Sequence, residues 1–335
     1  MDRRTFIAAL VALSACSEKE KPTRVVETPG PAPLAAAQAA RIPRVTILYF
    51  GSGTAQYTDM FRRRLSELGY VEGKNVLIDE RFAGGDSQRL AQIARELAAS
   101  KVDVIVAAAF AATAAAQQAT NTIPIVMVHA GTAGSGLIAS LAYPGGNVTG
   151  TTNLAHGGKE VDLIRELVPR AARIAILINP TNRGHADIVS SATDAARKFN
   201  IGATVAEVTR AEDFPNALTA IRNAQPDGLI VAVEPLIVTH GAKVIEFAAT
   251  AHLPAIYDLG DMARQGGLIA YATMYIEHYA LAADYVDRIL KGAKPADLPV
   301  QQPARFELVI NMKTAKALGL TVPLTLQVAA DEVIE

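Results

Sequence analysis

The chain has 335 residues, of which 50% are hydrophobic and 5% aromatic, and its formal net charge at pH 7 is −1. A balanced charge without a basic block argues against nucleic acid as a partner. The roughly 290 residues that follow a polar, Pro- and Ala-rich beginning exceed one ordinary hydrophobic core, so we expect two lobes.

The first 16 residues have the composition of a bacterial export signal. Arg3 and Arg4 precede a short apolar run, and small residues lead up to Cys16. The run is too short to span a bilayer, as expected of a secretory signal. The arginine pair, followed by Thr5 and Phe6, also resembles a twin-arginine signal, so both export routes stay open.

The four residues Leu13-Ser14-Ala15-Cys16 resemble the bacterial lipobox, in which the cysteine is acylated and becomes the first mature residue. Cys16 is the only cysteine and cannot form an internal disulfide; the alternative is a stray cysteine within the signal. We therefore expect lipid on Cys16 to anchor the protein to a membrane, on the periplasmic or cell-surface side. Residues 17–42 would then form a flexible tether.

From residue 43 the chain alternates between strand and helix patterns. A continuous apolar run at 45–50 indicates a strand buried in a parallel sheet, and apolar residues then recur at helical spacing until Gly69. Further strands are expected at residues 76–82, 103–108 and 125–129, and further helices at 86–99 and near 113–119. Such alternation predicts helices on both faces of a parallel sheet, with ligand sites beyond the carboxyl ends of the strands.

A second series of the same kind begins at residue 173, after a turn-rich stretch at 143–147 that ends the first lobe. Its expected strands are 173–178, 203–208, 228–233 and 255–257, and its expected helices are 186–199 and 214–224. Two similar lobes imply a cleft between them. The predicted fold class is therefore α/β, with two doubly wound parallel-sheet lobes and a ligand cleft.

Five strings carry a family resemblance. They are Gly-Tyr-Val-Glu-Gly-Lys-Asn-Val at 69–76, Pro-Gly-Gly-Asn-Val-Thr-Gly at 144–150, Lys-Pro-Ala-Asp-Leu-Pro-Val-Gln-Gln-Pro at 294–303, Phe-Glu-Leu-Val-Ile-Asn at 306–311 and Lys-Thr-Ala-Lys-Ala-Leu-Gly-Leu at 313–320. In this order, over nearly all of the chain after residue 43, they resemble the ABC transporter substrate-binding family, whose members include tryptophan- and tyrosine-associated binding proteins.

The resemblance implies a fold similar to the type I periplasmic binding proteins, in which the chain crosses between the lobes three times. By this analogy lobe one comprises residues 43–151 and 276–303, and lobe two comprises 152–275 and 304–335. It also implies hinge closure around a small-molecule ligand and delivery to an ABC permease with a separate ATPase. We expect a monomer that needs no cofactor and is not an enzyme.

The first strand-to-helix junction contains part of a dinucleotide fingerprint. Gly51, Ser52, Gly53 and Thr54 follow the strand, but Gln56 stands where close helix packing would want a third glycine. The incomplete pattern argues against a nucleotide-dependent enzyme. The helix start still offers N–H groups and a positive dipole end to a carboxylate, and Ser52 and Thr54 either contact the ligand or cap the helix.

The other junctions supply the remaining candidates. In lobe one the candidates are Phe110, Ala111, His129, Gly131 and Thr132, and in lobe two they are Asn179, Asn182, Glu234, Asp258, Tyr271 and Thr273. Phe110 would either stack on a ligand or seal the lobe interface. The six histidines lack the paired spacing of a metal site, so we expect no metal.

Two departures from the resembled family bear on ligand charge. Relatives commonly carry Asp-Pro where this chain has Gly131-Thr132, and an acidic residue where it has Met274. A buried ammonium group needs a negative partner, which Glu234 or Asp258 would then have to supply. If both instead cap helices or face water, the cleft favours an anion. We therefore expect a small carboxylic acid with an apolar or aromatic body, ahead of a free amino acid.

The main hypothesis is thus an extracytoplasmic solute-binding lipoprotein of an ABC importer. A ligand-binding sensory protein that feeds a membrane receptor fits the same sequence. A nucleotide-dependent enzyme is the third alternative, and the incomplete glycine pattern weighs against it.

Overall fold

The computed structural model describes residues 41–51, 55–131 and 133–335. The predicted signal, nearly all of the predicted tether, Cys16 and the site candidates Ser52, Thr54 and Thr132 lie outside the described residues. Residues Ile42–Glu335 form one compact unit that contains two sheets.

The first sheet has five parallel strands in the order β2-β1-β3-β4-β5. They are β1 (Arg44–Tyr49), β2 (Leu77–Phe82), β3 (Val104–Ala108), β4 (Ile125–Val128) and β5 (Val148–Gly150). All residues of β3 and β4 are buried, because helices cover both faces of a parallel sheet.

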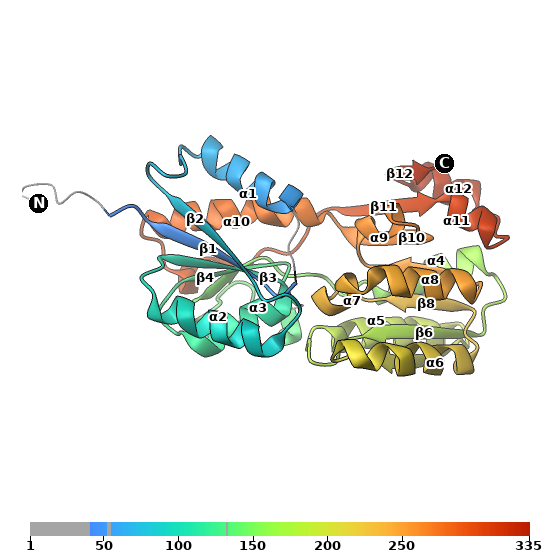
Figure 1. Cartoon of the computed structure of the whole chain (residues 1–335). Helices are drawn as coiled ribbons and strands as arrows, with labels where there is room; N and C mark the ends of the chain where they lie inside the picture. Colours follow the sequence, from blue (N-terminus) through green and yellow to red (C-terminus); the bar gives the residue numbers. More distant parts are fainter. Residues whose placement is uncertain (1–40, 52–54, 132) are drawn as a thin grey trace, which may run out of the picture. The chain divides into compact units, whose positions relative to one another are not determined.

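The helices of the first sheet lie on its two faces, as Figure 1 shows. On one face are α1 (Ala55–Glu67) and α10 (Tyr275–Leu290); on the other are α2 (Ser87–Ala99) and α3 (Ala109–Ala119). Alternate residues of β1 serve the two faces: Val45 and Ile47 pack with α1 and α10, and Leu48 packs with α2 and α3. Asp86 caps α2, because its carboxylate accepts the N–H groups of residues 88 and 89.

The second sheet has seven strands in the order β12-β11-β10-β9-β8-β6-β7. They are β6 (Arg173–Ile178), β7 (Gly202–Glu207), β8 (Gly228–Val231), β9 (Ala255–Tyr257), β10 (Ile269–Thr273), β11 (Phe306–Asn311) and β12 (Glu332–Ile334). The helices are α4 (Gly157–Leu167), α5 (His185–Lys198), α6 (Phe214–Ala224), α7 (Pro235–Thr239), α8 (Gly241–Thr250), α9 (Gly260–Arg264), α11 (Met312–Ala317) and α12 (Leu324–Ala329). Helices α4 and α5 pack on one face, and α6, α7 and α8 on the other.

The chain passes between the two sheets three times. It leaves the first sheet after β5, returns to it through α10 after β10, and enters the second sheet again at β11. The connections pair with one another, since the N–H of Thr152 donates to the carbonyl of Gln301 and that of Met274 to the carbonyl of Arg305. This architecture confirms the predicted fold class.

The last two strands, β11 and β12, run opposite to the other strands of the second sheet, since β12 pairs parallel with β11. β11 runs antiparallel to β10, and Thr273 at the end of β10 pairs with Phe306 at the start of β11. The cause is the excursion through α10: the chain leaves β10 at its carboxyl end and comes back to the same end, so the next strand must run in the opposite direction. The predicted parallel character holds for the pairs from β6 to β10.

Two predicted boundaries differ from the structure at the strand ends of the first sheet. The strand expected at 125–129 ends at Val128, because His129 has a positive φ of 51°, outside the strand region. The helix expected near 113–119 begins at Ala109, whose φ is 65°. A positive φ is uncommon in residues with a Cβ, and both residues stand at neighbouring strand ends.

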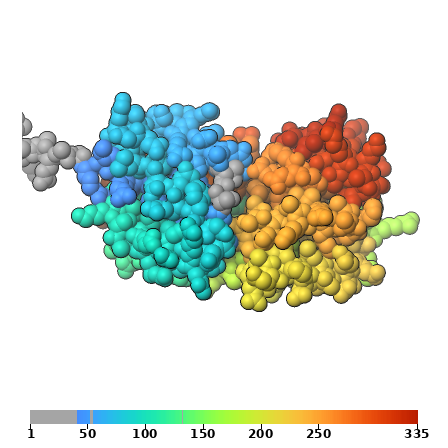
Figure 2. Space-filling view, viewed as in Figure 1, coloured from blue at the N-terminus to red at the C-terminus, as the bar shows by residue number. Residues whose placement is uncertain are grey.

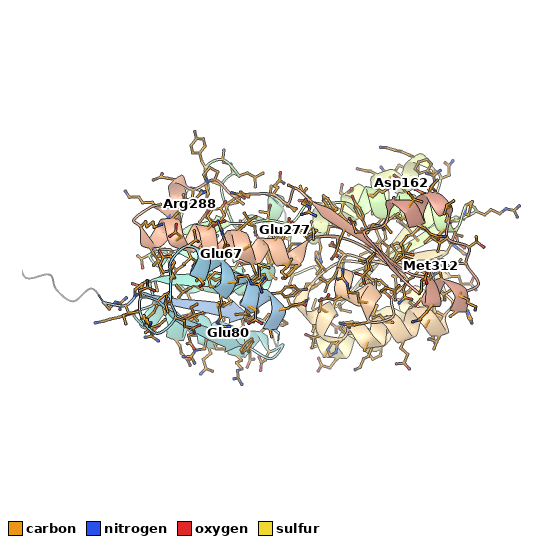
Figure 3. All side chains as sticks on the ribbon, turned by 90° about the horizontal axis from the view of Figure 1, so that it is seen from above. Glu67, Glu80, Asp162, Glu277, Arg288 and Met312 are labelled. Atoms are coloured by element: carbon orange, nitrogen blue, oxygen red, sulfur yellow. The ribbon has the colours of Figure 1, made fainter. Side chains whose placement is uncertain are left out.

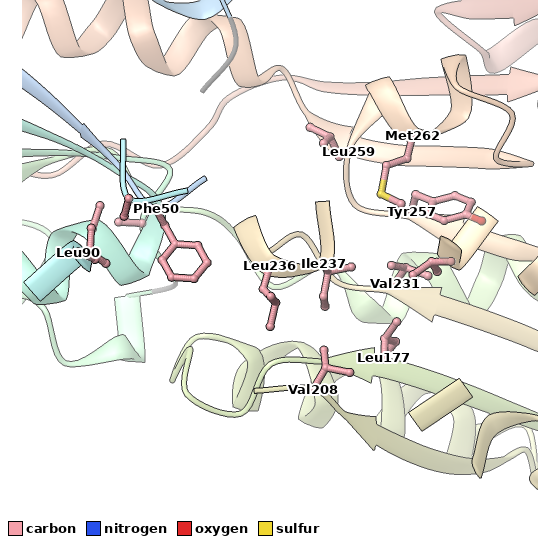
Figure 4. Packing of buried hydrophobic residues seen from close by; sticks show 14 of the residues in the cluster. Phe50, Leu90, Leu177, Val208, Val231, Leu236, Ile237, Tyr257, Leu259 and Met262 are labelled. Carbon is pink, nitrogen blue, oxygen red and sulfur yellow. The ribbon is translucent and has the colours of Figure 1, made fainter. Parts of the chain in front are cut away.

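Apolar packing is continuous between the two sheets. Figure 4 shows Phe50, which follows β1, facing Leu236 of α7, and both belong to a single buried cluster that also contains Leu259 and Met262. In Figure 2 the atoms coloured blue to green and those coloured yellow to red meet along one boundary. Figure 3 marks this boundary with Glu277, at the start of α10.

Candidate ligand-binding site

A cavity of about 400 Å³ lies at the carboxyl ends of strands from both sheets. Residues that follow β1, β3 and β4 contribute from the first sheet, and residues that follow β6, β8 and β9 contribute from the second. This is where ligands bind in doubly wound α/β folds, and the volume is that of a small-molecule site.

Of the predicted site residues that the structure describes, four line the cavity: Phe110, His129, Gly131 and Asn182. Gly51 also lines it, next to the undescribed Ser52 and Thr54, and Gly131 stands next to the undescribed Thr132. The other predicted residues within the described ranges do not line the cavity, and the hydrogen bonds, ion pairs and ring contacts that they make elsewhere explain their positions.

Aromatic side chains form one wall of the cavity. Tyr57 stacks on Tyr279 with ring centroids 5.5 Å apart and tilts against Tyr275 at 4.9 Å. The ring of His129 meets Tyr275 at 4.7 Å. Burial raises the pKa of all three phenols, so they stay neutral and present an apolar face with a few hydroxyl groups to a ligand.

His129 is buried and fixed by hydrogen bonds from both of its ends. Its backbone N–H donates to the Thr151 hydroxyl at 3.0 Å, and its Nε2 lies 2.8 Å from the Thr273 hydroxyl. Burial holds the pKa of His129 well below its ordinary value, so the ring is neutral. The predicted residue Thr273 therefore orients His129 instead of lining the cavity itself.

Two helix N-termini point their first turns at the cavity. The residues at the start of α3 (Ala108, Ala109 and Phe110) and of α5 (Gly184 and His185) line it, and neither helix has a side-chain cap. An uncapped first turn presents backbone N–H groups and the positive end of the helix dipole, which suit a carboxylate. The start of α3 has this character. In α5 the N–H groups of His185 and Ala186 already donate to the carbonyls of Asn182 and Arg183, and Asp187 places a carboxylate in the first turn. Ala111, in the first turn of α3, does not line the cavity itself.

His185 is locked in one tautomer beside the predicted residue Asn182. The Nδ1 atom of His185 accepts the backbone N–H of Asn179 at 3.0 Å, so the proton resides on Nε2, 3.2 Å from the carbonyl of Val233. Burial lowers the pKa of His185 and keeps the ring neutral. The side chain of Asn179 accepts from the N–H and hydroxyl of Thr181, which explains why it shapes the loop and does not reach the cavity.

The two carboxylates predicted from the sequence as ligand contacts, Glu234 and Asp258, interact with other protein groups and not with the cavity. Glu234 caps α7, because its Oε2 accepts the N–H of Leu236 at 2.7 Å, and burial raises its pKa. Asp258 is buried and forms an ion pair with His156 at 2.8 Å. Neither residue lines the cavity. Tyr271 is also outside the lining, because its ring stacks on Phe306.

Asp261 is the functional candidate that sequence reasoning missed. Among the lining residues of the described part, it is the one carboxylate, and no lysine or arginine accompanies it there. Its Oδ2 accepts the hydroxyl of Tyr57 at 2.8 Å and the amide of Gln56 at 3.3 Å, both from α1. The signal in the sequence was its position, four residues beyond a predicted strand end.

The charge of Asp261 is only partly neutralised. Its Oδ1 pairs with Arg264 at 3.2 Å, but this guanidinium also pairs with Glu307 at 2.7 Å and with Glu332 at 2.8 Å. Three carboxylates thus share one cation. The excess of negative charge at the cavity favours a cationic group on a ligand.

No helix in the described ranges has the length and apolar character needed to cross a membrane. The same ranges contain no group of three or more His, Cys, Asp or Glu side chains arranged to hold a metal ion.

The fold and site are those of a solute-binding protein, and comparison with known proteins defines the family. The family model described as "ABC transporter substrate binding protein" matches residues 45–334, so the chain belongs to this family. It is a binding protein and not an enzyme. Proteins of this family work outside the cytoplasm.

The chain is similar to several proteins over most of its length. It is 29% identical to a tyrosine-binding protein of Clostridioides difficile (strain R20291) over 261 residues, which cover 78% of this chain and 75% of that protein. A conserved domain protein from Vibrio cholerae has 28% identity and a TM-score of 0.81, with 88% of this chain and 100% of that one covered. An ABC domain from Streptococcus pneumonia in complex with L-Trp has 26% identity and a TM-score of 0.82, with 87% and 99% covered.

Proposed function

We propose that this chain is the extracytoplasmic solute-binding lipoprotein of an ABC importer and that its ligand is an amino acid with an aromatic or large apolar side chain. The observation that carries the proposal is the pairing of opposite charges in one cavity. The uncapped N-terminus of α3 suits a carboxylate, and Asp261 suits an ammonium group.

The cavity walls support the same ligand class. Phe110, Tyr57, Tyr275 and Tyr279 line it together with aliphatic side chains such as Val238. Such a surface buries a ring or a long apolar chain, which supplies most of the binding free energy for a small ligand. The similar proteins named for tyrosine and crystallised with L-Trp support this class as well.

Asp261 changes the expectation drawn from the sequence, where a carboxylic acid ranked ahead of an amino acid. Glu234 caps a helix, one of the two alternatives open for it, and Asp258 pairs with His156, which the sequence does not indicate; the cavity has a carboxylate of its own in Asp261. A zwitterion satisfies both the start of α3 and Asp261, whereas a simple acid leaves Asp261 with only its shared pair to Arg264.

Hinge motion between the two lobes would link ligand capture to transport. Residues 43–151 with 276–303 would move as one body and residues 152–275 with 304–335 as the other, with the three connections as the hinge. Closure would enclose the ligand and present both bodies to a permease that works with a separate ATPase. Lipid on Cys16 would hold the protein at the membrane, on the periplasmic or cell-surface side.

Calorimetry with three matched ligands tests the ligand class. L-tryptophan carries both charged groups, tryptamine lacks the carboxylate, and indole-3-propionic acid lacks the ammonium group. We expect L-tryptophan to bind most tightly and each of the other two more weakly. Tighter binding of indole-3-propionic acid would restore the carboxylic acid as the ligand class, and binding of none of the three would refute the proposed ligand.

A further inference from the structure

One buried imidazole contacts residues beside all three connections between the sheets. His156 ends the first connection, at the start of α4. Its ring lies edge-on to Tyr271, shortly before the second connection, and to Phe306, directly after the third, with both pairs of centroids 5.5 Å apart. Tyr271 and Phe306 in turn stack on each other at 5.2 Å. The position of this ring therefore depends on the path of every connection.

The contacts of the ring favour a positive charge on it. Nδ1 of His156 lies 2.8 Å from the carbonyl oxygen of Leu154, which only accepts, so Nδ1 carries a proton. Nε2 lies 2.8 Å from Oδ1 of Asp258, an ion-pair distance, although the angles between the two groups are not those of a hydrogen bond. Burial alone would lower the pKa of His156, but the carboxylate of Asp258 outweighs it and raises the pKa to about 10.

A second carboxyl group lies beside this pair. Glu160 stands one helical turn after His156 in α4, is 1% exposed, and its Oε1 has no hydrogen-bond partner among the described residues. Burial raises the pKa of Glu160 to about 8, although the His156 cation opposes the shift, and the charge of Asp258 adds to it. At neutral pH Glu160 is therefore protonated, and Asp258 holds the cation alone.

The ion pair is linked to the ligand cavity through Asp258. Its Oδ2 accepts from the side-chain amide of Asn153 at 3.5 Å and from the backbone N–H of Val233 at 3.4 Å. Both of these residues line the cavity, and they belong to different segments, one in the first connection and one after β8. These two contacts connect the ion pair to the cavity wall.

Two histidines and a tyrosine around this cluster keep their charge near pH 8. His129 interacts with His156, and His185 interacts with Asp258, but burial lowers the pKa of both, so they stay neutral. Tyr271 faces Glu160, and burial raises its pKa above 10.0. Glu307, on the adjacent strand β11, is paired with Arg264.

We propose that His156, Asp258 and Glu160 form a proton-linked positioning group for the ligand cavity. While Glu160 is protonated, the imidazolium balances Asp258, and Asn153 and Val233 keep their positions. When Glu160 loses its proton, two buried carboxylates compete for one cation, the contacts of Asp258 weaken, and the ligand binds less tightly. The binding readout rests on the proposed function; the positioning group itself does not.

Calorimetry at pH 7 and pH 8.5 tests the effect, with L-tryptophan as the probe and three proteins: wild type, Glu160→Gln and Glu166→Gln. Glu166 lies on the same helix but is exposed, so it is the matched control. We expect the affinity of wild type and Glu166→Gln to fall by up to about fourfold more than that of Glu160→Gln, the limit for one linked proton with a midpoint near pH 8. The ligand's own titration affects all three equally. An equal loss in all three would overturn the proposal.

A measurement without ligand separates this proposal from the proposed function. We expect the ring ¹H–¹³C resonance of His156 to shift with a midpoint near pH 8 in the wild-type protein and to lose that transition in Glu160→Gln. The transition supports the positioning group even if L-tryptophan does not bind, in which case only the proposed ligand fails. A His156 resonance that is constant from pH 7 to pH 8.5 in wild type would overturn the positioning group whatever the ligand.

Discussion

Replacing Asp261 by asparagine tests whether the negative charge of this side chain contributes to ligand binding. The two side chains have the same shape, so Tyr57 can still donate to the remaining carbonyl oxygen, and Arg264 keeps its pairs with Glu307 and Glu332. What is lost is the negative charge. A hydrogen bond to a charged group contributes about 1.5–3 kcal/mol, and because the Asp261 side chain is 27% exposed, the lower half of this range applies.

A loss of about 1.5–2 kcal/mol corresponds to an affinity about 10- to 30-fold weaker. We expect Asp261→Asn to weaken L-tryptophan and tryptamine by this factor and to leave indole-3-propionic acid within about twofold of wild type. Isothermal titration calorimetry on purified protein measures all three.

The control variant is Asp194→Asn, an exposed carboxylate on α5 that pairs with Arg197 away from the cavity. We expect it to bind all three ligands as wild type does. An equal loss of affinity for all three ligands in Asp261→Asn would mean that Asp261 maintains the shape of the cavity and does not interact with the charge of the ligand. Unchanged affinity for L-tryptophan would refute the role of Asp261 in ligand binding.

Three further predictions concern the anchor, the hinge and stability. Cys16→Ala should release the protein from the membrane fraction or leave it unprocessed, and equal retention of variant and wild type in a fractionation would exclude the lipid anchor. Ligand at saturation should lower the radius of gyration in solution scattering, whereas an unchanged value would argue against hinge closure. Glu160 and His156 have folded pKa values of about 8 and about 10, raised from ordinary values of 4.5 and 6.5. Each group therefore contributes stability that is complete below its ordinary pKa and is lost as pH rises through its folded pKa. The midpoint of thermal unfolding should therefore fall from pH 6.5 to pH 8, less steeply in Glu160→Gln, and a flat profile in wild type would contradict the buried cluster.

The repeating strands and helices could be predicted from the sequence because their signals are local. The apolar runs of β1, β3, β4 and β6 are continuous, since both faces of each strand are buried, and the helices between them carry a 3.6-residue period. The direction of β11 could not be read in this way. The direction of β11 depends on where the chain re-enters the sheet after α10, and the six residues of β11 carry no signal for that point.

The candidate site was predictable to the level of its junctions, but not to the level of its charges. The strand ends named from the sequence include the segments around Phe110, His129 and Asn182, which line the cavity. Near β9, Asp258 is closer to the strand than Asp261, yet Asp258 turns inward to His156 while Asp261 lines the cavity. The orientation of Asp258 depends on His156, which lies 102 positions earlier in the chain, so no local sequence pattern indicates it.

The placement of α10 on the first sheet has a consequence for biosynthesis. Helices α1 and α10 cover one face of the first sheet, where Tyr279 and Ala282 belong to the same buried cluster as Val45 and Ile47, yet 124 residues separate the end of β5 from the start of α10. Ribosomes add about 5–20 residues per second, so on the order of ten seconds pass during synthesis before α10 is available to cover this apolar face. A nascent chain in this interval exposes a half-covered sheet, and we expect it to be a client of holding chaperones until its last third has been made.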